Sequence, residues 1–105
     1  MKQRNRALTR QLDRYHIRFN DAFWGFFAAE VEPYLSATPV LADLGCGPGL
    51  FLYDASRRLP LAVLNGVDFG TEMLEYAKNL EYAGTVPKMH QADISTKLPF
   101  DDGSI

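Results

Sequence analysis

The chain has 105 residues, of which 47% are hydrophobic, 12% aromatic and 23% charged. This composition is typical of one globular domain and excludes a disordered or collagen-like polypeptide. No apolar run approaches the roughly 18 residues of a membrane-spanning helix, and the first residues lead into no signal-peptide core, so we expect a soluble cytoplasmic protein. The single cysteine, Cys46, excludes an internal disulfide, and we expect no metal site.

The net charge of −2 is unevenly distributed. Residues 1–18 contain six of the eleven Lys and Arg residues but one of the thirteen Asp and Glu residues. Such a basic segment could contact nucleic acid, act as an organelle transit segment or form the solvated face of a helix. We favour the helix, because hydrophobic residues recur at three- and four-residue steps. They are Leu8, Leu12, Tyr15, Phe19, Phe23, Phe26 and Phe27.

This periodicity predicts one N-terminal helix from about Ala7 to Val31, which ends before Pro33 because a proline disfavours helical geometry in the preceding residue. Its aromatic cluster of Phe23, Trp24, Phe26 and Phe27 is expected to be core, with an apolar substrate pocket as the alternative.

From residue 40 onward, short apolar runs alternate with helical patterns. The expected order is a strand at Val40–Leu44, a loop at Gly45–Gly49, a helix from Leu50 to Leu59, a strand at Leu61–Val67, a helix from Thr71 onward and a strand at Val86–Ala92. We expect the first strand to be buried on both faces, Thr71 to cap its helix and Gly84 to end that helix. This alternation predicts an α/β fold with a parallel sheet and helices packed on it.

Three acidic residues, Asp43, Asp68 and Asp93, fall at or near the carboxyl ends of the three predicted strands. Ligands of open parallel sheets bind outside these strand ends. Asp68 follows the glycine-rich loop at a spacing that lets a carboxylate accept hydrogen bonds from both ribose hydroxyls. Each aspartate alone is more simply a loop or capping residue, but three in register predict a nucleoside-like ligand.

The glycine loop narrows the class of nucleoside. Glycines at 45, 47 and 49 let the backbone turn sharply and approach a ligand closely. The dinucleotide fingerprint needs a further glycine where this chain has Leu50, and the Gly-Lys-Ser or Gly-Lys-Thr sequence of the ATP and GTP loop is absent. A dinucleotide or nucleoside triphosphate is therefore disfavoured.

Several motifs together resemble the class I S-adenosylmethionine-dependent methyltransferases, in the order and spacing of that family. They are the segment from Val40 to Gly49, the segment from Gly66 to Leu74, the segment from Gln91 to Ile94 and the segment from Leu98 to Ser104. The resemblance implies a Rossmann-like parallel sheet with flanking helices, preceded by an N-terminal aromatic-rich helix, and S-adenosylmethionine as the cofactor. It also divides the chain into a helical cap at 1–35 and a cofactor-binding first half-domain at 36–105.

The resemblance also implies roles for single residues. Gly45, Cys46, Gly47 and Gly49 would pass around the methionine part of the cofactor, with Asp43 near its amino group. Asp68 would hold the ribose hydroxyls, Phe69 and Met73 would flank the adenine, Asp93 would accept from its exocyclic amine, and the backbone of Ile94 would face the ring. Tyr15 and His16 are candidates for substrate contact, and no residue is assigned to catalysis.

The family sheet has seven strands in the order 3-2-1-4-5-7-6, so the resemblance implies a fold truncated after the third strand. We expect the order 3-2-1, with the first strand as an open edge that invites pairing. The chain would then be a fragment, or be completed by a second polypeptide or by a second copy of itself.

Three functions remain open. The first is the cofactor-binding portion of a methyltransferase that acts on a small-molecule acceptor. The second is a non-catalytic or incomplete methyltransferase-like subunit that needs a partner chain. The third is a nucleic-acid modifying protein that uses the basic segment, and the acidic remainder of the chain makes it the least favoured.

Overall fold

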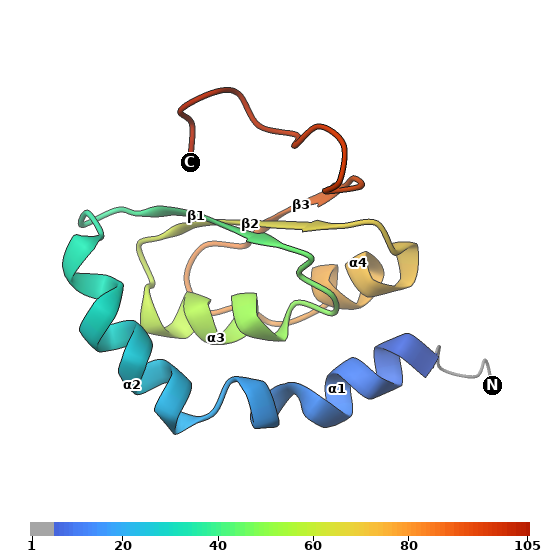
Figure 1. Ribbon diagram of the computed structural model, residues 1–105, viewed down its shortest axis with the longest axis horizontal. Helices are drawn as coiled ribbons and strands as arrows, with labels where there is room; N and C mark the ends of the chain where they lie inside the picture. The colour runs from blue at the N-terminus through green and yellow to red at the C-terminus, as the bar shows by residue number, and fades with distance from the viewer. Residues whose placement is uncertain (1–5) are drawn as a thin grey trace.

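The computed structural model describes residues 6–105, so residues 1–5 of the predicted cap lie outside the described part. The elements in chain order are α1 (Arg6–Arg18), α2 (Asp21–Glu30), the short 3-10 helix η1 (Glu32–Tyr34), β1 (Val40–Leu44), α3 (Leu50–Arg58), β2 (Val63–Asp68), α4 (Thr71–Lys78) and β3 (Lys88–Gln91). Figure 1 shows the helices on one side of the sheet, while the residues after β3 cross its other side.

The three strands are parallel and lie in the order β1-β2-β3. Val40 of β1 pairs with Val63 of β2, and Asn65 of β2 pairs with Lys88 of β3. The predicted α/β class, parallel sheet and strand order are therefore confirmed. Because the strands are parallel, the carboxyl ends of β1, β2 and β3 all lie at one edge of the sheet, which is where open α/β sheets bind their ligands.

The prediction of one long N-terminal helix is wrong, because the chain forms two helices that meet at Phe19 and Asn20. Asn20 adopts an extended backbone, and its side-chain oxygen accepts a hydrogen bond from the Phe23 amide at 3.0 Å. This interaction satisfies a free amide at the start of α2 and favours a new helix start over continuation. The break lets α1 and α2 take different directions (Figure 1).

Three further expectations need correction. β1 is only partly buried, because within the described residues it pairs on one side alone, and Val40 and Leu44 are exposed. Gly70, and not Thr71, occupies the N-cap of α4, because Gly70 has an extended backbone and the helix begins at Thr71. The Thr71 hydroxyl accepts a hydrogen bond from Gln91. α4 ends at the C-cap Asn79, several residues before Gly84.

The hydrophobic core lies between the sheet and the helices α2 and α3. Its buried residues include Trp24, Phe27, Cys46, Leu52, Ala55, Ala62, Leu64 and Leu74. The Trp24 indole stacks on the Phe51 ring at 5.4 Å between centroids, and the Arg58 guanidinium lies 4.3 Å from the Trp24 centroid. The aromatic cluster is thus core as expected, except that the Phe26 side chain is 61% exposed.

Within the part of the chain that the structure describes, every helix is too short or too polar to cross a membrane.

Candidate functional site

The glycine loop joins β1 to α3 at the carboxyl edge of the sheet. Gly45, Gly47 and Gly49 have φ angles of 77°, 55° and 84°, in the left-handed region that side chains disfavour. The amides of Gly45 and Cys46 both donate to the Val67 carbonyl, at 2.7 and 2.9 Å, which anchors the loop to the end of β2. The sequence predicted that this loop would turn sharply, and the positive φ angles confirm it.

Asp68 ends β2 and connects two loops. Its Oδ2 accepts from the Gly47 amide at 2.9 Å, and its Oδ1 accepts from the Gly70 amide at 2.8 Å. The structure therefore brings Asp68 to the glycine loop, as the sequence indicated. Each carboxylate oxygen can accept more than one hydrogen bond, so Asp68 keeps acceptor capacity for a further donor such as a hydroxyl.

Asp43 lies near the end of β1, one residue away from the glycine loop, and is half-buried. Burial raises the pKa of its carboxyl, the negative charge of Asp68 raises it further, and the positive charge of Arg18 opposes both effects. Because burial and a neighbouring negative charge both disfavour the ionised form of Asp43, a positively charged ligand group beside Asp43 would stabilise that form.

A cavity of about 130 Å³ lies between α1 and the glycine loop. Its lining residues are Gln11, Tyr15, Arg18, Phe19, Asp43, Leu44, Gly45, Cys46, Pro48, Leu50 and Phe51. The Gln11 side chain lies against Gly47, where an added Cβ would be 3.2 Å from Gln11 Oε1. The cavity is therefore enclosed by residues far apart in the sequence, with α1 as one wall.

Two protonated groups line this cavity. The Tyr15 hydroxyl donates to the Asp54 carboxylate of α3, and burial together with this hydrogen bond raises the pKa of Tyr15. Burial, assisted by the negative charges of Asp43 and Asp68, raises the pKa of the Cys46 thiol to about 12. The thiol is thus a packing group rather than a nucleophile near neutral pH.

The other predicted site residues lie along the same edge of the sheet but are more exposed to solvent. The Phe69 side chain is 72% exposed, and Met73 is partly buried beside Gly70. Asp93 is exposed, and hydrogen bonds from the Ser95 hydroxyl and amide, both to its Oδ1, lower the pKa of its carboxyl. Ile94 is 47% exposed.

The two candidates on α1 differ in position. Tyr15 lines the cavity, whereas His16 is exposed and lies outside the lining set. Sequence reasoning missed Gln11, Arg18 and Asp54. Gln11 and Arg18 stand four residues before and three after Tyr15, so helical spacing could have placed them on one face with it. Nothing in the sequence pattern indicated that Asp54 would meet Tyr15.

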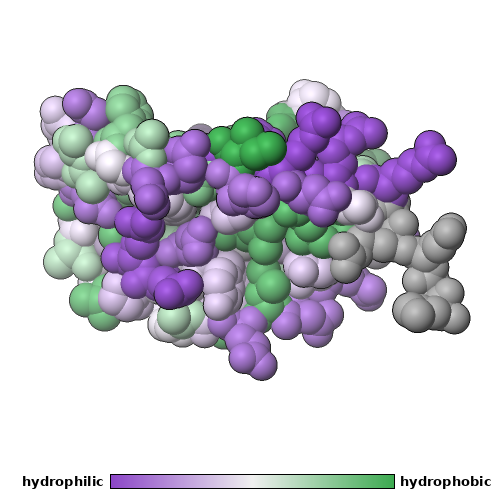
Figure 2. Space-filling model, turned by 90° about the horizontal axis from the view of Figure 1, so that it is seen from below, coloured by the Kyte–Doolittle hydropathy of each residue, from purple (hydrophilic) through white to green (hydrophobic). Residues whose placement is uncertain are grey.

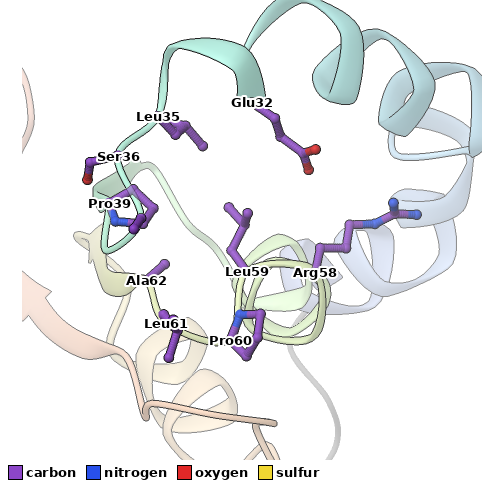
Figure 3. A pocket seen from close by; sticks show the side chains of 10 residues that line it. Glu32, Leu35, Ser36, Pro39, Arg58, Leu59, Pro60, Leu61 and Ala62 are labelled. Carbon is purple, nitrogen blue, oxygen red and sulfur yellow. The ribbon is translucent and has the colours of Figure 1, made fainter.

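A second cavity, of about 220 Å³, lies at the opposite edge of the sheet. Figure 3 shows Leu35, Pro39, Leu59 and Ala62 around it, with the charged groups of Glu32 and Arg58 toward its rim. Pro39 and Ala62 precede β1 and β2, so this cavity is at the amino ends of the strands, away from the edge where such sheets bind ligands.

Among residues 6–105, no three His, Cys, Asp or Glu side chains gather as a metal site would require.

Comparisons with known proteins agree on one family. A family model described as "Methyltransferase domain" matches residues 41–105. Two curated relatives, each named trans-aconitate 2-methyltransferase and from two strains of Pseudomonas aeruginosa, are 55% identical over 38 residues, which is 36% of this chain and 14% of theirs.

Solved structures show the same fold. The plantazolicin methyltransferase BpumL, in complex with a triazolic desmethylPZN analog and SAH, is 23% identical with a TM-score of 0.62 over 94% of this chain and 37% of that one. Its complex with a pentazolic analog and SAH gives a TM-score of 0.61 at the same identity and coverage. The chain therefore spans well under half the length of these relatives.

Proposed function

The chain belongs to the methyltransferase domain family, and from this premise we propose that it is the cofactor-binding portion of an S-adenosylmethionine-dependent methyltransferase that acts on a small-molecule acceptor. The matching solved structures are methyltransferases in complex with SAH, and the curated relatives are named for a small-molecule acceptor. The observation that supports the proposal most strongly is the pair of hydrogen bonds from the Gly47 and Gly70 amides to Asp68. They hold the glycine loop beside a carboxylate that can accept from a ribose.

The residues at this edge fit the chemistry of S-adenosylmethionine. The cofactor combines hydroxyl donors, an ammonium group and a sulfonium with a single carboxylate, so most of its polar groups need hydrogen-bond acceptors and negative charge rather than an anion clamp. Asp43 and Asp68 supply both. At Gly45 an added Cβ would meet nothing within 4 Å, so the backbone is open on that side to a closely approaching ligand.

We assign Asp43 to the amino group of the cofactor and Asp68 to its ribose. The loop residues Gly45, Cys46, Gly47 and Gly49 would pass around its methionine part. Phe69, Met73, Asp93 and Ile94 would surround the adenine. Tyr15 and His16 stay candidates for substrate contact, with Tyr15 favoured because it lines the cavity. The division into a cap at 1–35 and a cofactor-binding part at 36–105 belongs to this proposal.

When bound, S-adenosylmethionine supplies a methyl group that is already activated by its positively charged sulfur. The chain's own residues would then bind and orient the reactants and exclude water. α1 covers the glycine loop, and the Tyr15 and Asp54 side chains hold it there. The loop carbonyls and the two carboxylates would fix the cofactor against this wall.

Among the described residues, no strand pairs with the outer edge of β1, and its Val40 and Leu44 side chains are 38% and 45% exposed. These observations favour a second candidate, an incomplete methyltransferase-like subunit whose sheet another chain completes. Light scattering tests one form of this second candidate, because a second copy that pairs on this edge doubles the mass of the isolated chain.

Calorimetric titration with S-adenosylmethionine and S-adenosylhomocysteine tests the proposal. We expect Asp68→Asn to weaken binding by about tenfold or more, because its amide nitrogen would face a backbone donor and one charged acceptor would be lost. The control is Asp102→Asn on an exposed carboxylate outside the site. Full affinity in Asp68→Asn, with both variants folded by circular dichroism, would contradict the assignment.

A further inference from the structure

The second cavity, at the amino ends of β1 and β2, has no part in the proposed function. Its volume is about 220 Å³, against about 130 Å³ for the cavity between α1 and the glycine loop. A cavity of about 150 Å³ with aliphatic and aromatic walls is enough to hold benzene. The second cavity is therefore large enough for the side chain of leucine, methionine or phenylalanine.

The walls of this cavity are mostly apolar. Pro39 and Ala62 are buried, and Figure 3 shows them across from the half-buried side chains of Leu35 and Leu59. Leu61 also lines the cavity but is 66% exposed, so the cavity opens to solvent on that side. An aliphatic or aromatic group that entered from solvent would lose contact with water, and this transfer is favourable in proportion to the apolar area buried.

Two side chains of opposite charge stand at the rim. Glu32 of η1 and Arg58 at the end of α3 both line the cavity, and Figure 3 shows their charged groups on the same side of it. The Arg58 guanidinium lies over the Trp24 ring, 4.3 Å from its centroid. Contact with a ring uses the face of a guanidinium, so its in-plane N–H groups can still donate to a carboxylate. The Glu32 carboxylate can accept from an ammonium group.

We propose that this cavity binds a free α-amino acid with an apolar side chain. The side chain would lie between Leu35 and Leu59, the ammonium group would pair with Glu32, and the carboxylate would pair with Arg58. An α-amino acid carries both charged groups on the carbon that bears its side chain, so it matches an apolar cavity with both charges at one side. Because the glycine loop lies at the opposite edge of the sheet, this amino acid is a second ligand and not the methyl acceptor.

Calorimetric titration of the protein at its natural length, without cofactor, tests the apolar side chain of the ligand. The probes are L-leucine, L-methionine and L-phenylalanine, with the shorter L-alanine and the polar L-asparagine as controls. We expect at least one of the three probes to bind about tenfold or more tightly than both controls, because it buries more apolar area. No binding of any probe, or equal binding of L-asparagine, would overturn the proposal. Either result would leave the proposed function standing, since no cofactor takes part.

Derivatives of the amino acid that binds best test its two charges. The carboxamide lacks the carboxylate, and the N-acetyl derivative lacks the ammonium group. We expect each to bind about tenfold or more weakly than the amino acid, because one charge-assisted pair is lost. The carboxamide also represents the amino terminus of a peptide and the N-acetyl derivative a carboxyl terminus. Full affinity of either derivative would overturn the free amino acid as the ligand.

Variants of the protein connect each charge of the ligand with one side chain. We expect Glu32→Gln to raise the Kd of the amino acid by about tenfold and to leave the Kd of its N-acetyl derivative unchanged. Arg58→Gln should act in the same way on the amino acid and its carboxamide, and Arg58→Lys should restore part of the affinity. The controls are Glu30→Gln and Arg57→Gln, at exposed positions outside the cavity lining.

Circular dichroism verifies that each variant is folded. Arg58→Gln also removes the contact with Trp24, so Glu32→Gln, for which no ring contact is at stake, keeps the test decisive if Arg58→Gln unfolds. Unchanged binding of the amino acid in folded Glu32→Gln, or an equal loss in the control variants, would overturn the site.

Discussion

α1 and α2 follow one another in the chain, yet they attach to the molecule in different ways. α2 buries Trp24 and Phe27, which are 5% and 8% exposed, in the hydrophobic core. α1 buries Leu8 alone among its thirteen residues, and it contacts α3 through the polar pair of Tyr15 and Asp54. One helix is part of the fold, and the other is a wall of the candidate site.

This difference has a physical basis in the sequences of the two helices. α2 is almost entirely apolar, so its position is set by the area that it removes from water. α1 has four arginines and a narrow apolar stripe. Figure 2 shows mainly hydrophilic residues at the end of the molecule where the N-terminus lies. A helix held by few buried groups opens at a low free-energy cost, which suits an element that covers a ligand site.

Removal of the largest α2 side chain should have the largest effect on stability. We expect Trp24→Ala to lower the free energy of unfolding by about 3 to 5 kcal/mol, because the cavity left behind also removes the stacking with Phe51. Phe26→Ala, at an exposed position of the same helix, should cost well under half of that. Urea unfolding measures both, and equal losses would show that α2 is not a core helix.

Two glycines of the glycine loop differ in the same way as α2 and α1, because one faces the core and the other the candidate site. Gly49 faces the core, where an added Cβ would lie 2.7 Å from Ala77 Cβ, whereas one at Gly45 would meet nothing within 4 Å. Both have positive φ, so Gly45→Ala should cost about 1 to 2 kcal/mol from backbone strain alone. Gly49→Ala adds overpacking of about 1 to 3 kcal/mol. Thermal unfolding of the pair would contradict this contrast if their losses were the same.

Much of the fold could be predicted because its signals are local. Short apolar runs alternate with helical patterns and glycines mark the turns, which is sufficient for the strand order. The break at Asn20 was missed because the aromatic periodicity continues through it and hides the cap. The prediction that β1 is buried on both faces was also wrong, since the burial of a strand depends on its neighbours and not only on its own residues.

The candidate site divides in the same way. The approach of Asp68 to the glycine loop was predictable, because parallel strands present their carboxyl ends at one edge. The pairing of Tyr15 with Asp54 was not, since it depends on how α1 lies across α3 after the break at Asn20. Contacts between helices that are distant in the sequence leave no periodic signal in either of them.

Asp43 should show a conflict between stability and binding. Its raised pKa means that the folded state disfavours the charged form, so the free energy of unfolding falls as pH rises from the ordinary value of 3.8 through the folded pKa. Asp43→Asn should therefore raise stability at pH 7, while cofactor affinity falls by about tenfold or more. Urea unfolding and calorimetry measure the two effects. A variant that loses stability at pH 7 would contradict the raised pKa, and a variant that keeps full affinity would contradict a ligand role for this carboxylate.

The polar contact of α1 should have the smallest effect on stability. Tyr15→Phe removes one hydrogen bond to Asp54 and should lower the free energy of unfolding by about 0.5 to 1.5 kcal/mol at pH 7. The control Tyr34→Phe should leave it unchanged, because the Tyr34 side chain is 85% exposed. The pKa of Tyr15 is raised in the folded protein, so the unfolded chain loses this proton first as pH rises above 10. The stability that Tyr15 contributes is thus complete below pH 10 and declines above it. The difference between the wild-type chain and Tyr15→Phe should narrow from pH 7 to pH 10.5, and a difference that stays constant would mean that the Tyr15 hydroxyl does not hold α1 in place.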